Sequence, residues 1–210
     1  MIASPPAVVR TGAALSGLLL VLFTLVHLAG LIPAVLAPER FESYASALHS
    51  SSWLRPVEIG LAVIAVLHVG LTISKAITNR RAGNIAQLSS RRDAPLAALA
   101  SRSKGLAGLL TLTFLVVHLN QLRWPRPAAG QETAVLSSML QQPLNAVLYA
   151  AAALVLALHL LHGTEAAHRS LGWLSPTNSS ALRMGGRLLA TLIGGGFLLM
   201  SLSLALGGTA

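Results

Sequence analysis

Two stretches of the chain repeat one pattern, LSGLLLVLFTLVHL at residues 15–28 and LAGLLTLTFLVVHL at residues 106–119. Each stretch places one histidine, His27 or His118, deep in an apolar run, and in each a glycine comes ten residues before the histidine. Ionisable side chains inside apolar membrane spans are rare and usually functional. We take this repeated helix as the element around which the rest of the chain is organised.

The composition outside these stretches is also that of an integral membrane protein. Of the 210 residues, 54% are hydrophobic and 10% are charged, which is too apolar for an ordinary soluble domain. A helix needs about 20 apolar residues to cross the hydrocarbon core of a bilayer. Five runs meet this requirement, at residues 13–36, 57–77, 105–122, 144–164 and 184–206. The sequence therefore predicts an all-α integral membrane protein, a bundle of five transmembrane helices in one domain over residues 1–210.

The basic residues indicate how the bundle is oriented. Eleven of the 15 Lys and Arg residues fall at the N-terminus and in the second and fourth connections, and four fall in the other connections. The eleven are Arg10, Lys75, Arg80, Arg81, Arg91, Arg92, Arg102, Lys104, Arg169, Arg183 and Arg187. By the positive-inside rule the N-terminus is cytoplasmic and the C-terminus is outside. We interpret the net charge of +9 as this topology signal rather than as a nucleic-acid surface.

The connections between the spans carry weaker signals. We expect a short interfacial helix within residues 37–55, a partly helical cytoplasmic connection at residues 78–103, and a loop at residues 123–142. Pro143 suits the first turn of the fourth span, because no amide donor is lost there. The glycines at residues 194–196 predict close packing of the fifth helix against a neighbour.

Four histidines occupy four consecutive spans, one in each. His27 and His118 follow a cytoplasmic helix start at similar depth, which places both in the outer half of the bilayer. His68 and His159 lie in the inner half. Two planes of two histidines fit bis-histidine ligation of two haems, since a six-coordinate haem needs two axial ligands facing each other. Zinc or copper would require ligands that converge on one point.

Two further residues are candidates for contacts with the inner haem. His162 lies one turn nearer the cytoplasm than His159, and we prefer His159 as the ligand and assign His162 to a propionate or to the surroundings of the ligand. Lys75 comes seven residues after His68 on the same helix face, where it could reach a propionate. Because the chain has no cysteine, it can neither hold an iron–sulfur cluster by thiolates nor attach haem covalently.

The contexts of the histidines carry a family resemblance. They read LVHL at 25–28, FESYA at 41–45, LHS at 48–50, LH at 67–68, SR leading to VHL at 101–119, and LHLLHG at 158–163. Together with five helices, they resemble the cytochrome b membrane anchor of succinate dehydrogenases and related fumarate reductases, in its single-chain dihaem form. The resemblance extends from Arg10 to the fifth helix.

This resemblance implies a set of cofactors and partners. The outer haem b would be held by His27 and His118, and the inner haem b by His68 and His159. A flavoprotein subunit and an iron–sulfur subunit would dock on the cytoplasmic face of a bacterial-type cytoplasmic membrane. Electrons from succinate would pass from these partners through the two haems to a quinone, commonly menaquinone in the dihaem form. The sequence leaves open whether the complex oxidises succinate or reduces fumarate.

Quinone reduction takes up protons, so a carboxylate or a histidine near the quinone is required. Glu42 and His49 in the first outer connection are our candidates, with Glu58 behind them. Two other functions stay open. The chain could be the haem-bearing anchor of another membrane oxidoreductase, such as a hydrogenase or a formate dehydrogenase. It could also be a haem-free transporter with a histidine relay, although the spans hold no acid besides Glu58 and show no inverted repeat.

Overall fold

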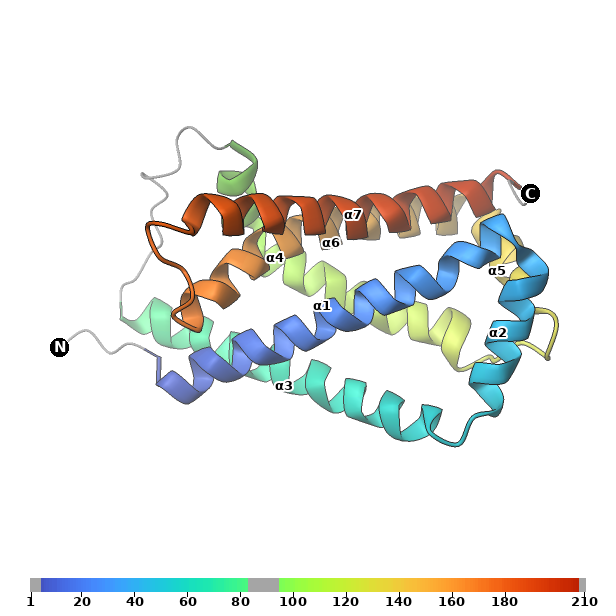
Figure 1. Ribbon diagram of the computed structural model, residues 1–210, viewed down its shortest axis with the longest axis horizontal. Coiled ribbons are helices and arrows are strands. Elements are labelled where there is room, and N and C mark those ends of the chain that lie inside the picture. The colour runs from blue at the N-terminus through green and yellow to red at the C-terminus, as the bar shows by residue number, and fades with distance from the viewer. Residues whose placement is uncertain (1–4, 83–94, 208–210) are drawn as a thin grey trace.

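The computed structural model describes residues 5–82 and 95–207, which form long helices that run side by side (Figure 1). Five helices in this part of the chain are long and apolar enough to cross a membrane. They are α1 (Ala7–Leu36), α3 (Leu54–Arg81), α4 (Pro95–His118) with its extension η2 (Leu119–Arg123), α6 (Pro143–Ser170) and α7 (Ser179–Ala205). The five predicted spans are therefore confirmed as helices. Arg91, Arg92 and the middle of the connection predicted at residues 78–103 lie outside the described residues.

Each spanning helix is longer than the apolar run that predicted it, at 27 to 30 residues. Apolar residues mark only the part of a helix that would lie in hydrocarbon, and polar residues at either end continue the same hydrogen-bonded ladder. The fourth span shows this best, because α6 runs on through Thr164 to Ser170 where the sequence predicted a connection. Pro143 begins α6, as predicted.

Two short helices gather at one end of the bundle, beside the C-terminal end of α1 (Figure 1). The helix α2 (Pro38–Ser50) confirms the short helix expected after the first span. The helix α5 (Glu132–Leu140) corrects the prediction of a loop at residues 123–142. Below, the loop end is the end that carries α2 and α5, and the basic end is the opposite one, which carries Arg10 and Lys75.

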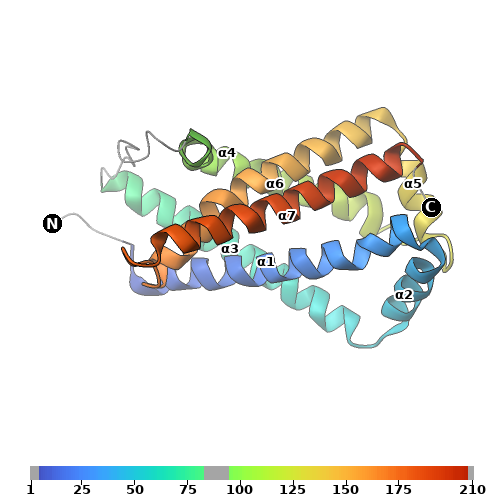
Figure 2. The ribbon, with the colours of Figure 1, turned by 45° about the horizontal axis from the view of Figure 1, so that its top comes forward.

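Close packing joins α6 to α7 and to α4, and α1 to α3. Figure 2 shows α7 beside α6, with α1 crossing α3. A Cβ atom at Gly194 would lie 2.5 Å from the Cβ of Ala157 in α6, and one at Gly196 would lie 2.5 Å from a methyl carbon of Leu28 in α1. The predicted close approach at the glycine triplet is thus confirmed at two of its three positions.

The helix α3 is attached differently from the others. None of its residues is buried, and its main packing partner among the described helices is α1. Polar contacts tie its two ends to the rest of the bundle. At the loop end Glu58 pairs with Arg123 of η2, and at the basic end Lys75 donates a hydrogen bond to Ser170 of α6, 3.0 Å away. The side chain of His68 extends from α3 between these two ties.

Candidate functional site: two facing histidine pairs

Four histidines face each other in two pairs inside the bundle. His27 of α1 and His118 of α4 have ring centres 6.0 Å apart and ring planes at 77°. His68 of α3 and His159 of α6 have ring centres 6.5 Å apart and ring planes at 85°. We call these the loop-end pair and the basic-end pair, after the nearer end of the bundle. The structure thus brings together the same partners that the depth of each histidine predicted.

The separation of the rings suits two ligands of one metal ion. Imidazoles that bind a metal from opposite faces, each through a bond of about 2.0 Å as at zinc, have ring centres about 6 Å apart. In the alternative arrangement, a hydrogen bond would join the two imidazoles directly, and one nitrogen of each ring would lie within about 3 Å of the other. Both pairs satisfy the metal spacing at once, on four different helices. The geometry therefore fits two bis-histidine sites.

One histidine of each pair has its Nδ1 atom engaged by the protein. In the basic-end pair, Nδ1 of His68 lies 3.1 Å from the carbonyl oxygen of Ala13 and 3.2 Å from the hydroxyl of Ser16. In the loop-end pair, Nδ1 of His118 lies 3.3 Å from the hydroxyl of Tyr149. Hydrogen bonding at Nδ1 leaves Nε2 available for a metal and fixes the orientation of the ring.

Glycines of the repeated helix make room for the basic-end pair. A Cβ atom at Gly17 would lie 2.9 Å from Cε1 of His68, and one at Gly108 would lie 3.4 Å from Cε1 of His159. Each glycine therefore serves the histidine of a neighbouring helix, while the histidine ten residues later on its own helix belongs to the other pair. This arrangement gives a physical reason for the glycine-to-histidine spacing of the repeat.

Aromatic side chains surround the loop-end pair. Phe23 stacks on His27 with ring planes at 12°, and Phe197 of α7 approaches the same ring at 5.9 Å. Phe114 lies 5.7 Å from the ring of His118. Such rings restrict the orientation of an imidazole and exclude water from it. Both features suit a site for a flat apolar macrocycle with polar edges.

Positive charge gathers around Lys75 at the basic end of the bundle. Lys75 is half-buried, and Lys104, Arg10 and Arg169 lie close enough to repel its charge. These four cations come from α3, α4, α1 and α6, and one of them, Arg169, is paired with Glu165 at 2.7 Å. Cations held together at a cost in repulsion suit a bound anion, and haem propionates are anions of this kind. His162 lies partly buried on α6, three residues beyond His159, which is the histidine that faces His68.

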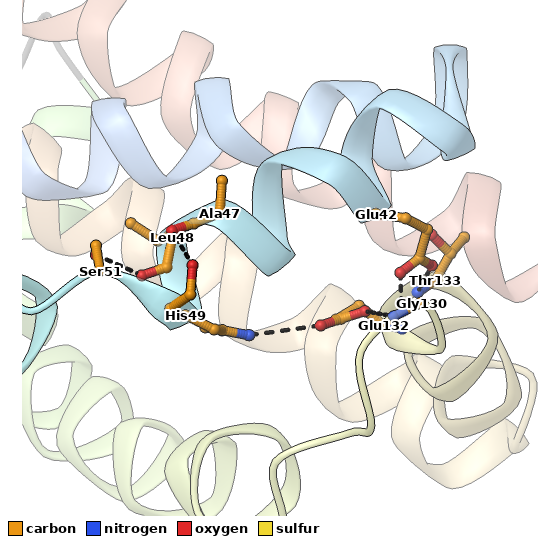
Figure 3. Close-up of polar contacts among 9 residues, drawn as sticks. Glu42, Ala47, Leu48, His49, Ser51, Gly130, Glu132 and Thr133 are labelled. Atoms are coloured by element: carbon orange, nitrogen blue, oxygen red, sulfur yellow. Dashed lines mark hydrogen bonds and ion pairs between the residues drawn. The ribbon is translucent and has the colours of Figure 1, made fainter.

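Two of the candidates at the loop end, Glu42 and His49, make polar contacts with the start of α5 (Figure 3). Glu42 of α2 accepts hydrogen bonds from the backbone N–H groups of Glu132 and Thr133, at 3.1 and 2.7 Å, and so caps the N-terminus of α5. His49 lies 3.5 Å from the carboxylate of Glu132, which is buried. Glu58 is paired with Arg123. Glu42 and His49 thus both contact the first turn of α5, and their role with a quinone stays a prediction.

The hydrogen bonds to Glu42 outweigh the effect of its burial. Burial alone would raise the pKa of this carboxyl group, because it disfavours the charged form. The hydrogen bonds from Glu132 and Thr133 favour the charged form and hold the pKa of Glu42 below its ordinary value of 4.5. Glu42 therefore stabilises the contact between α2 and α5 as a carboxylate.

Sequence reasoning missed three residues of these sites. Tyr149 contacts His118, Ser16 contacts His68, and Glu132 contacts His49. A signal was available for Tyr149, which is the one tyrosine within a predicted span. Ser16 and Glu132 are common residue types at ordinary positions, and only the packing of the helices brings them to the histidines.

Comparisons of the chain with models of protein families, with curated proteins and with solved structures find no match.

Proposed function

We propose that the chain is the dihaem cytochrome b membrane anchor of a succinate:quinone oxidoreductase in a bacterial-type cytoplasmic membrane. The observation that carries the proposal is the two facing histidine pairs, at 6.0 and 6.5 Å, in a bundle of five apolar helices. Bound there, two b haems would supply one-electron carriers at two depths of the membrane. The resemblance of the histidine contexts to the succinate dehydrogenase family supports the choice of reaction.

The residues of the chain have distinct roles in this proposal. His27 and His118 hold one iron, and His68 and His159 hold the other. Contacts at Nδ1 orient two of these four rings, and the aromatic residues around His27 and His118 exclude water. Lys75 neutralises propionate charge at the basic end, together with Arg10, Lys104 and Arg169.

The proposed partners follow from the distribution of charge and from the missing cysteines. We assign the basic end to the cytoplasm, where its cations favour an acidic docking surface. A flavoprotein subunit and an iron–sulfur subunit bind at this end, and the cluster that feeds electrons to the anchor belongs to the partner, because this chain has no thiolate ligands. The quinone, menaquinone in this proposal, binds at the loop end, where the His49–Glu132 contact offers a place to hold a proton.

The test is to purify the tagged chain with its partners from its own membrane and to record its optical spectrum before and after addition of succinate. The proposal predicts co-purified flavin and iron–sulfur subunits, and a b-type haem absorbance that succinate reduces. Reduction by formate or hydrogen but not by succinate would support the anchor of another oxidoreductase. A preparation without haem would reject the cytochrome and favour the transporter.

A further inference from the structure

A chain of hydrogen bonds leads from His118 to the loop end of the bundle. Nδ1 of His118 lies 3.3 Å from the hydroxyl of Tyr149, and that hydroxyl donates to Oε1 of Gln121 at 3.1 Å. Nε2 of Gln121 donates to Oδ1 of Asn145 at 3.0 Å. Nδ2 of Asn145 in turn donates to the backbone carbonyl of Met139, also at 3.0 Å. Five residues of α4, η2, α5 and α6 are linked in this way.

The far end of the chain fixes the direction of every bond in it. A backbone carbonyl can only accept, so Asn145 must use its amide N–H toward Met139 and turn its oxygen toward Gln121. Gln121 must then donate with its own amide group, which leaves its oxygen facing Tyr149. The single proton of the Tyr149 hydroxyl is therefore used toward Gln121. The phenolic oxygen is left to accept a hydrogen bond from His118.

We propose that Tyr149 is a positioning residue that holds His118 in the tautomer with its proton on Nδ1, so that Nε2 carries the lone pair that binds iron. The tautomer follows from the hydrogen bonds alone, and the role of Nε2 rests on the proposed function. Tyr149 is 7% exposed, so a hydroxyl that lost its partners would be left unsatisfied in an apolar surrounding. The backbone carbonyl of Ala13 does the same for His68 in the other pair.

The two pairs therefore differ in how they can be altered. His68 is held by the Ala13 carbonyl, a backbone group that no substitution removes, and also by the Ser16 hydroxyl, whereas the contact of His118 with Tyr149 is made by a side chain alone. When a neighbouring group accepts a hydrogen bond from Nδ1–H, the imidazole becomes a stronger electron donor to the metal through Nε2. A stronger donor stabilises the oxidised state of the metal. With haem bound, the Tyr149 hydroxyl thus lowers the reduction potential of the loop-end site. At the basic-end site the corresponding contact is made by the main-chain carbonyl of Ala13.

The first test measures the tautomer in the haem-free protein. Ring ¹⁵N NMR on the chain in lipid bilayers identifies His118 as the signal that a His118→Gln variant lacks. In the wild type we expect the ring proton of His118 on Nδ1. In Tyr149→Phe we expect the tautomer equilibrium of His118 to shift toward the form with the proton on Nε2. Tyr44→Phe is the matched control, because Tyr44 is the only other tyrosine and its hydroxyl lies beside Gly30. A Gln121→Leu variant, which keeps the phenol but removes its acceptor, should shift the tautomer in part.

The second test measures the reduction potentials of the haem-loaded chain. Tyr149→Phe should raise one of the two potentials and leave the other in place, and Tyr44→Phe should raise neither. An unchanged His118 tautomer in Tyr149→Phe, or an Nε2–H signal in the wild type, would overturn the inference even if two haems bind. A chain that binds no haem would reject the proposed function, while the NMR result would still decide the tautomer.

Discussion

Gly17 of α1 lies against the imidazole ring of His68 in α3, so closely that a Cβ atom at this position would be 2.9 Å from Cε1 of the ring. The ring cannot simply turn away, since the Ala13 carbonyl and the Ser16 hydroxyl hold its Nδ1. His68 can therefore occupy this position only because residue 17, which lies 51 residues earlier in the sequence, has no side chain.

Replacing Gly17 by alanine should displace His68 and disturb the basic-end pair. Overpacking of this kind costs about 1–3 kcal/mol. We expect a lower melting temperature and loss of one of two haems per chain, measured by thermal unfolding and haem quantitation. Gly108→Ala, where the distance to His159 is 3.4 Å, should have a smaller effect. Gly70→Ala meets no atom within 4 Å and is the control. Equal behaviour of Gly17→Ala and Gly70→Ala would refute this role.

The ion pair between Glu58 and Arg123 should contribute measurably to the attachment of α3. The guanidinium group donates two hydrogen bonds, of 2.6 and 2.5 Å, and each side chain is about one-third exposed. Pairs that are partly screened by solvent contribute about 1 kcal/mol. A double-mutant cycle with Glu58→Gln and Arg123→Gln, followed by thermal unfolding, measures the interaction free energy between the two side chains. Additive effects of the two substitutions would show that the pair contributes nothing.

The cap that Glu42 provides for α5 should depend on pH. Its pKa in the folded state lies below the ordinary value of 4.5, so the ionised carboxylate stabilises the fold at neutral pH. This contribution is fully present above the unfolded-state pKa and is lost as the pH falls through the lower, folded-state pKa. Glu42→Gln should cost about 1 kcal/mol at neutral pH, a typical value for a helix cap.

The measurement for Glu42 is the difference in melting temperature between the wild type and Glu42→Gln, taken from about pH 6 down to about pH 3. The difference should narrow below pH 4.5. Glu39→Gln is the matched control, because Glu39 lies on the same helix and is exposed. A difference that stays constant across this range would show that the charge of Glu42 is not what stabilises the contact.

The orientation assigned from the basic residues can be measured directly, because the chain has no cysteine and an introduced thiol is unique. Ser50→Cys lies at the loop end and Ser180→Cys at the basic end, and both serines are exposed. A membrane-impermeant maleimide applied to intact cells should label Ser50→Cys at once, and Ser180→Cys only after permeabilisation. The reverse pattern would place the basic end outside.

Sequence patterns predicted the parts of this protein that depend on periodicity and depth. The apolar runs located all five spanning helices, and the depth of His27, His118, His68 and His159 predicted the two facing pairs. Both signals are local, because a residue's depth follows from counting along one helix at a fixed rise per residue. The pairing of the four histidines could therefore be predicted without knowing how the helices pack against one another.

Contacts between segments distant in sequence could not be predicted in this way. The helix α5 forms in a stretch with a weak pattern, and its first turn is capped by Glu42, 90 residues earlier. The contact of Gly17 with His68, and that of Tyr149 with His118, depend on how two helices are rotated toward each other. Rotation is decided by the packing of whole helix faces, which a count of residues along one helix does not determine.

The most direct measurement of the two-site arrangement is the haem content of two double variants, His27→Ala with His118→Ala and His27→Ala with His68→Ala. The first removes both members of one pair, and it should keep one b haem per chain. The second removes one member of each pair, and it should keep none, while the wild type keeps two. Equal haem content in the two double variants, or a wild type without haem, would contradict the two bis-histidine sites.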